Sequence, residues 1–242
     1  MNKKPLGIGN ALRSIAFYLF FYTCSILMGL TVPFFIWLGG RNGAIWICTR
    51  WSNMHRWGVV HIIGIKVVIE GTVPSGPVFV ALKHESMFEA IDLPTLLPFP
   101  AVFAKVELLK VPFWGKAGGM YGLVPVERDQ GAKALRAMVS AARSLSQENR
   151  PLAIFPEGTR VRHGRKPALQ AGFAGLYKMI GLPVVPVAVD TGPLLHGRWK
   201  RRGTVTYRFG ETIPAGLPRE EIEARVHSAI NALNSAPDEA PA

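Results

Sequence analysis

The stretch between Arg13 and Arg41 constrains the fold more than any other feature, because positions 14 to 40 carry no charged residue. Roughly 20 apolar residues are enough to cross the hydrocarbon core of a bilayer. A cleavable signal peptide would have a shorter apolar core and a small-residue cleavage site. Tryptophans, which favour the membrane interface, stand at positions 37, 46, 51 and 57. The sequence therefore predicts a membrane segment that the mature protein retains.

The way this segment meets the bilayer has two interpretations. Pro33 and the pair Gly39-Gly40 are expected to interrupt the apolar run, and basic residues flank it on both sides. Without a charge asymmetry, the positive-inside rule sets no orientation. We therefore expect a helix that enters one leaflet and returns, followed by an amphipathic helix through "AIWICTRWSNMHRW". A single membrane span is the alternative.

The charge balance indicates an anionic partner. Lys and Arg number 28 and Asp and Glu number 16, so the formal net charge is +12. Such a chain suits a nucleic acid, a membrane surface or a phosphorylated substrate. No nucleic-acid-binding module is recognisable, which disfavours the first. Basic clusters that we expect to face solvent or anionic lipid head groups contain Arg162, Arg165 and Lys166, and Arg198, Lys200, Arg201 and Arg202.

From about residue 63 the pattern predicts an α/β domain. Short apolar runs rich in β-branched residues alternate with helical stretches, which is typical of a mixed, largely parallel sheet flanked by helices. We expect residues 1–62 to form an N-terminal membrane arm of two apolar helices, 63–234 the α/β domain and 235–242 a flexible tail. The predicted strands are "IKVVIEG", "PVFVALK", "AVFAK", "YGLVPVER", "PLAIFPEG", "PVVPVAVD" and "TVTYRFG", and the predicted helices span 86–97, 131–147, 170–181 and 218–234.

Four polar clusters follow four of the predicted strands. Open α/β sheets place their ligand crevices at the carboxyl ends of strands, so these clusters are expected to meet. No P-loop, dinucleotide-binding fingerprint, GxSxG elbow or aspartate pair is present to suggest another chemistry. The clusters are Lys83-His84, Lys105, Glu127-Arg128 and Glu157-Gly158-Thr159-Arg160.

The segment "KHESMFEA" admits a structural and a catalytic interpretation. It is not a zinc-protease motif, because HExxH requires a second histidine where Phe88 stands. Ser86 and Glu89 have the spacing of a capping box, so Glu89 could simply close the start of a helix. Alternatively, His84 in the preceding loop meets Glu89 in the first turn, and the carboxylate orients the imidazole as a general base. The two roles are compatible.

Taken together, four blocks in order resemble the glycerolipid acyltransferase family, typified by bacterial 1-acylglycerol-3-phosphate acyltransferases. The resemblance covers about residues 65–210. The family's common first block has Asp where this chain has Glu89, with Asn before the histidine and Gln after it. The blocks are "KHESMFE", "YGLVPVER", "FPEGTR" and "LPVVPVAVD", with "AKVELLKVPFWG" between the first two.

The resemblance implies a membrane-bound enzyme that acylates the sn-2 hydroxyl of lysophosphatidic acid and forms phosphatidic acid. His84 would be the general base and Glu89 its orienting carboxylate. The acyl thioester of coenzyme A or acyl carrier protein would be the co-substrate, with no metal or other cofactor. The expected location is the cytoplasmic face of a bacterial inner membrane. Residues expected to bind the substrate are Lys105, Arg128, Glu157, Gly158, Thr159, Arg160 and Pro186.

Two other functions stay open at this point. The enzyme could use another lyso-lipid as acceptor, such as a lyso-ornithine lipid. The chain could instead be a catalytically silent protein that keeps the fold and binds anionic lipids, in which case Glu89 has only its capping role.

Overall fold

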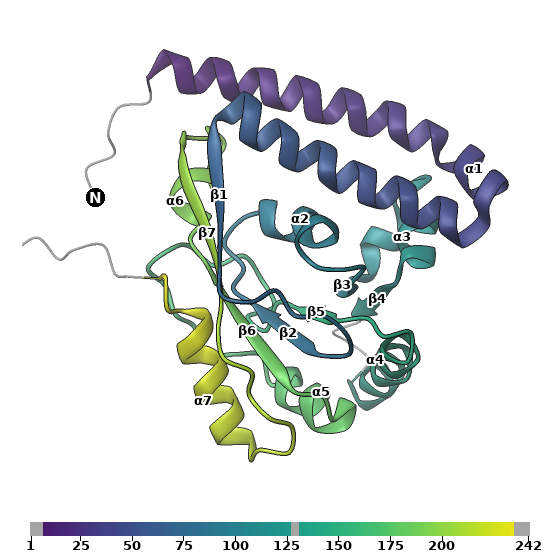
Figure 1. Ribbon diagram of the computed structural model, residues 1–242, viewed down its shortest axis with the longest axis vertical. Helices are drawn as coiled ribbons and strands as arrows, with labels where there is room; N and C mark the ends of the chain where they lie inside the picture. The colour runs from purple at the N-terminus through teal and green to yellow at the C-terminus, as the bar shows by residue number, and fades with distance from the viewer. Residues whose placement is uncertain (1–6, 127–130, 235–242) are drawn as a thin grey trace, which may run out of the picture.

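The structure is a computed structural model, and it describes residues 7–126 and 131–234. Its centre is a seven-stranded sheet in the order β1-β7-β6-β2-β5-β3-β4 (Figure 1). All pairs of neighbouring strands are parallel except β6 with β7. The mixed, largely parallel sheet predicted from the sequence is thus confirmed. The strands are β1 Ile65–Glu70, β2 Phe79–Leu82, β3 Ala101–Lys105, β4 Leu123–Val126, β5 Leu152–Ile154, β6 Val184–Val189 and β7 Gly203–Phe209.

The apolar character of the central strands has a direct structural reason. All four residues of β2 are buried, and successive side chains of a strand point to opposite faces of the sheet. Val80 and Leu82 pack into one hydrophobic cluster, and Phe79 and Ala81 pack into another. Both faces of β2 are therefore covered, which excludes the alternation of polar and apolar residues seen in half-exposed strands.

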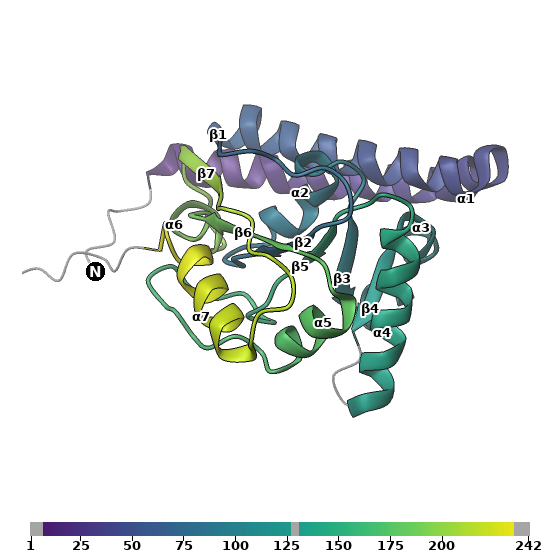
Figure 2. The same cartoon turned by 60° about the horizontal axis from the view of Figure 1, so that its bottom comes forward.

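Helices cover the two faces of the sheet as separate layers (Figure 2). Helix α1 and helix α2 lie against the face that contains Val80 and Leu82, and α4, α5 and α7 lie against the other. The four helices predicted for the α/β domain are all present, each within a few residues of its expected bounds. The helices are α1 Ile8–Gly58, α2 Phe88–Leu96, α3 Trp114–Tyr121, α4 Gly131–Ser146, α5 Gly172–Ile180, α6 Gly192–Leu195 and α7 Arg219–Ile230, with short helical segments at Val59–Ile63 and Val106–Lys110.

Helix α1 reverses direction at Gly40, whose φ of 53° and ψ of −128° lie outside the helical region. Glycine adopts such a positive φ at little cost. The two halves of α1 then run side by side (Figure 1), with the indole N–H of Trp51 donating to Ser25 Oγ at 2.8 Å. Pro33 was expected to interrupt the run as well, but it lies inside the helix. Length and apolar composition alone would allow this helical region to cross a membrane.

Helix α3 was not predicted, because its segment "WGKAGGMY" is rich in glycine, a poor helix former. Packing explains both the helix and the glycines. A Cβ on Gly115 would lie 2.0 Å from the Leu109 carbonyl oxygen, so only glycine fits there. The ring of Trp114 lies 5.1 Å from that of Trp51, and its N–H donates to the Ser25 carbonyl at 3.2 Å. Tertiary contact with α1 therefore overrides the local preference of the segment.

Candidate active site

The centre of the site is His84, two residues beyond the carboxyl end of β2. Parallel pairing continues past the strand, since the Lys83 N–H donates to the Val187 carbonyl at 2.9 Å. The His84 carbonyl accepts a hydrogen bond from the Val161 N–H at 2.7 Å. Because β2 lies in the middle of the sheet, His84 is placed by rigid main chain from β6 on one side and by the loop after β5 on the other.

His84 and Glu89 form the pair that the sequence predicts. His84 Nδ1 lies 3.0 Å from Glu89 Oε1, and the Glu89 side chain is fully buried while that of His84 is 15% exposed. The imidazole also stacks on Phe155, with ring centroids 4.1 Å apart. Since a carboxylate only accepts, Nδ1 carries the hydrogen and the Nε2 lone pair is left to accept a proton. The arrangement suits a general base.

The Glu89 carboxylate also closes the start of α2. It accepts hydrogen bonds from the backbone N–H groups of Glu85 and Ser86, from Ser86 Oγ and from Thr191 Oγ1. In return, Ser86 Oγ accepts from the Phe88 N–H at 3.1 Å, so the reciprocal pattern of a capping box is present. Burial raises the pKa of Glu89, but the bonds from His84 and Ser86 outweigh it and lower that pKa overall. One carboxylate thus makes the contacts that both roles require, those of a capping residue and those of an orienting partner for His84.

Replacing Glu89 with glutamine tests the orienting role. The amide has nearly the same shape, and the hydroxyls of Ser86 and Thr191 can turn to accept hydrogen bonds from its NH₂ group. We expect the fold to persist and turnover to fall by about 10²-fold or more, because the charge that stabilises the protonated imidazole is gone. The measurement is the rate of acyl transfer beside the melting temperature. Unchanged turnover in a folded variant would leave Glu89 with its capping role alone.

The loop after β5, residues 157–165, is here named the EGTR loop. Its first residue, Glu157, is buried and accepts a hydrogen bond from Lys83 Nζ at 2.6 Å. Gly158 has a φ of 69°, which turns the chain outward. Thr159 and Arg160 are then exposed. The structure places Glu157 as an anchor of the loop and presents the next polar side chains to solvent.

Positive charge gathers on the side of the site near Arg160. Burial and the charge of Arg160 together lower the pKa of Lys200 to about 8. Lys200 Nζ donates to the carbonyls of Leu195 and Gly197, at 2.6 and 2.9 Å. Two like charges close enough to perturb each other favour an anion between or beside them.

The other predicted binding residues lie in different surroundings. Lys105 is exposed at the carboxyl end of β3, separated from β2 in the sheet by β5. Pro186 is buried in the middle of β6, opposite Ala81 of β2, and not at the end of its strand. Arg128 lies outside the described residues. The structure therefore joins His84 directly to Glu89 and, through the His84 backbone N–H at 3.5 Å, to Glu157. It places Thr159 and Arg160 on the loop that Glu157 anchors.

Two further contributors were not named from the sequence. Thr191, two residues after β6, donates to Glu89 at 2.9 Å, and Phe155, the residue after β5, stacks on the imidazole ring. Both stand just beyond strands, so the rule that located the four clusters would also have found them. Neither threonine nor phenylalanine is by itself typical of a catalytic site, so the search for polar clusters after strands did not select these two residues.

Comparisons with known proteins show which family the chain belongs to. Residues 64–190, more than half of the chain, match the sequence model of the family described as Acyltransferase. A 1-acyl-sn-glycerol-3-phosphate acyltransferase of Pseudomonas aeruginosa is 28% identical over 229 residues, covering 93% of this chain and 87% of that protein. One of Limnanthes douglasii is 32% identical over 153 residues, covering 62% of this chain and 53% of that protein.

A solved structure shows the same fold. The crystal structure of the 1-acyl-sn-glycerophosphate (LPA) acyltransferase PlsC from Thermotoga maritima superposes with a TM-score of 0.73. It is 21% identical in sequence, and the match covers 94% of this chain and 96% of that one. With the family match over residues 64–190, these findings show that the chain belongs to the acyltransferase family.

Proposed function

We propose that this protein transfers a fatty acyl group from a thioester to the sn-2 hydroxyl of lysophosphatidic acid, forming phosphatidic acid for phospholipid synthesis. The observation that carries the proposal is the His84–Glu89 pair, 3.0 Å apart, at the carboxyl end of the central strand β2. Relatives from a bacterium and a plant that carry the name 1-acyl-sn-glycerol-3-phosphate acyltransferase support this choice of substrate.

His84 acts as general base in this scheme. Its Nε2 takes the proton of the acceptor hydroxyl while the hydroxyl oxygen attacks the thioester carbonyl carbon. The carbon–sulfur bond then breaks, and the imidazolium gives this proton to the leaving thiolate. Glu89 keeps the imidazole oriented and stabilises its protonated form. The step balances with side chains and the thioester alone, so no covalent acyl-enzyme is required.

The acceptor's phosphate is held by basic side chains around the strand ends. Arg160 is exposed on the EGTR loop and Lys105 is exposed at the end of β3. Guanidinium groups suit bidentate phosphate contacts. We assign Arg160, Lys105 and Arg128 to the phosphate, and we assign Gly158 and Thr159, with Glu157 as anchor, to the shape of the glycerol site.

Helix α1 brings the site to a membrane surface in this proposal. Large apolar side chains remain exposed along it, including Leu19, Ile26 and Trp37, which is 80% exposed. Exposed apolar surface of this extent marks an interaction site, and the acceptor and the product both reside in a bilayer. The thioester of coenzyme A or of acyl carrier protein would approach from the aqueous side, on the cytoplasmic face.

Replacing Arg160 with alanine tests both the site and the acceptor. A charge-assisted hydrogen bond contributes about 1.5–3 kcal/mol, and exposure reduces it. We therefore expect the KM for lysophosphatidic acid to rise roughly tenfold, the change that corresponds to about 1.4 kcal/mol. The assay follows labelled phosphatidic acid formed by the protein in lipid nanodiscs, with acyl-coenzyme A and acyl carrier protein as parallel donors.

Arg162, exposed two residues further along, provides the matched control, and its replacement with alanine should leave the KM unchanged. A lyso-lipid that lacks a phosphate group should be insensitive to both replacements. If wild-type protein acylates only such a lipid, the reaction class holds and lysophosphatidic acid is not the acceptor. If no lyso-lipid is acylated, the protein is a lipid-binding member of the family.

A further inference from the structure

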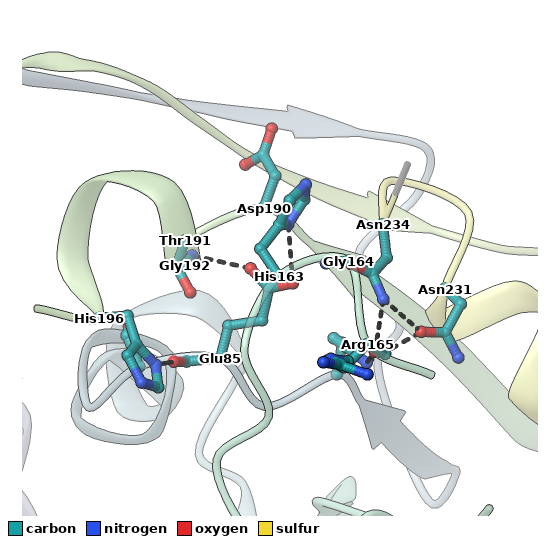
Figure 3. Close-up of polar contacts among 12 residues, drawn as sticks. Glu85, His163, Gly164, Arg165, Asp190, Thr191, Gly192, His196, Asn231 and Asn234 are labelled. Atoms are coloured by element: carbon teal, nitrogen blue, oxygen red, sulfur yellow. Dashed lines mark hydrogen bonds and ion pairs between the residues drawn. The ribbon is translucent and has the colours of Figure 1, made fainter. Parts of the chain in front are cut away.

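A second histidine–carboxylate pair lies directly beside the first, and the proposed reaction uses neither of its members. Glu85 follows His84 in the chain, and its side chain is fully buried. Its Oε1 accepts a hydrogen bond from His163 Nδ1 at 2.9 Å, and its Oε2 accepts one from the Gly192 N–H at 2.7 Å (Figure 3). His163 belongs to the EGTR loop, so this pair joins the loop to the catalytic segment.

The two ends of the EGTR loop are fixed to the residue on the other side of His84. Lys83 Nζ donates to Glu157 Oε1 at 2.6 Å and to the Arg165 carbonyl at 2.9 Å. Asn234 also donates to the Arg165 carbonyl, at 2.7 Å, and accepts from the Gly164 N–H (Figure 3). These contacts set where the loop begins and ends.

The middle of the loop is tied at two further points. The His84 carbonyl accepts from the Val161 N–H at 2.7 Å, and Glu85 accepts from His163. Three consecutive residues, from Lys83 to Glu85, therefore all bind one loop. Arg160 stands immediately before these two ties, so they hold its backbone beside the segment that contains His84.

We propose that Glu85 and His163 are a positioning pair that sets Arg160 relative to His84 and thereby strengthens binding of the acceptor's anionic head group. This inference rests on the proposed function, in which Arg160 holds the phosphate. Neither residue touches the reacting atoms. The pair acts through the loop, so it changes the affinity for the acceptor and leaves the rate of the chemical step unchanged.

The charges around His163 give the pair a pH dependence. The hydrogen bond from His163 to Glu85 raises the pKa of His163, and burial lowers it. The nearby charge of Asp190 raises this pKa slightly, and that of Lys83 lowers it slightly. His196 faces the pair through its bond to the Glu85 carbonyl, and Arg162 and Arg165 flank His163 in the sequence. Because the net shift is upward, the protonated pair forms fully below the ordinary histidine pKa. It is lost as the pH rises through the raised value.

The test compares His163→Ala with wild type and with His227→Ala. His227 is a suitable control, because its Nε2 contacts the Lys166 carbonyl, at 3.2 Å, just beyond the loop. Below the raised pKa, His163→Ala should raise the KM for lysophosphatidic acid roughly tenfold, with kcat changed by less than about threefold. His163→Gln keeps a donor toward Glu85 and should recover part of the loss. The control should match wild type.

Two comparisons exclude a merely structural effect. The KM difference between wild type and His163→Ala should shrink as the pH rises, because wild type then loses the charged pair. Because the two proteins are compared at the same pH, ionisation of the acceptor's own phosphate affects both alike and cancels from the KM difference. Gly192→Ala should also raise the KM for lysophosphatidic acid, although it changes no charge. The added Cβ would lie 2.9 Å from Glu85 Oε2 and 3.0 Å from the His163 Cβ and would therefore displace the pair.

A fall in kcat at unchanged KM in His163→Ala, or a KM difference independent of pH, would overturn the proposal. Hydrogen exchange of the loop amides supplies a readout that needs no turnover. The Val161 and Gly164 amides should exchange faster in His163→Ala than in wild type. In His227→Ala they should exchange at the wild-type rate. If wild type does not acylate lysophosphatidic acid, the proposed function fails on its own, and the exchange result still decides whether the pair holds the loop. Unchanged exchange would refute it.

Discussion

Replacing His84 with glutamine is expected to reduce turnover by about 10²–10⁴-fold, the range that general acid–base catalysis contributes. Glutamine can still donate a hydrogen bond to Glu89, but it cannot take a proton from the acceptor hydroxyl. The Glu89 carboxylate keeps its four other donors, Glu85 N–H, Ser86 N–H, Ser86 Oγ and Thr191 Oγ1. The fold should therefore lose at most about 1 kcal/mol, the typical net value of one hydrogen bond.

The measurement is single-turnover acyl transfer by the protein in nanodiscs, beside binding of lysophosphatidic acid. His84→Gln should bind the lipid as wild type does while product formation falls. His227→Gln is the matched control and should keep full activity. Turnover within a few-fold of wild type in His84→Gln would remove the general base from this site, and a loss of lipid binding would indicate a structural role for His84.

Replacing Lys83 with methionine is expected to destabilise the protein by about 3–5 kcal/mol, the usual cost of breaking a buried ion pair from one side. The Lys83 and Glu157 side chains are both fully buried. All three protons of Lys83 Nζ are used, by Glu157, the Arg165 carbonyl and Asn231. Burial raises the pKa of Glu157, and Lys83 opposes that shift. Without Lys83, the carboxylate is left uncompensated in the interior.

The melting temperature in nanodiscs measures this effect. For a chain of this size 1 kcal/mol corresponds to about 2–4 °C, so a decrease of about 10 °C is expected. The double variant Lys83→Met with Glu157→Gln should recover much of the loss, since an uncharged pair needs no compensation. A decrease of less than about 3 °C in the single variant would show that water reaches the pair. Equal losses in the single and double variants would show that the ion pair itself is not responsible.

The sequence located the strands well, because a strand buried on both faces reads as a short, continuous apolar run. β2, with Phe79, Val80, Ala81 and Leu82 all buried, is the plainest case. The same pattern failed for α3, where glycines that look unfavourable for a helix permit contacts such as that of Gly115 with the Leu109 carbonyl. Local preference cannot report a contact with a distant segment.

The pairing of His84 with Glu89 was predictable from five residues of local spacing together with the capping box at Ser86. The roles of Glu157 and Glu85 were not. In the sequence, Glu157 belongs to "FPEGTR" and is expected at the substrate, whereas the structure binds it to Lys83, 74 positions away. Glu85 is adjacent to His84, yet its partner His163 is 78 positions away.

By itself, then, the sequence determined which residues can carry charge and protons, where the strands run and at which edge of the sheet their polar ends meet. These follow from local periodicity and from the rule for parallel strands, and both act over a few residues. Only the tertiary structure decided that three consecutive residues, Lys83 to Glu85, hold the EGTR loop. The physical reason is that buried carboxylates must find donors, and the folded chain supplies those donors from segments that the sequence places far apart.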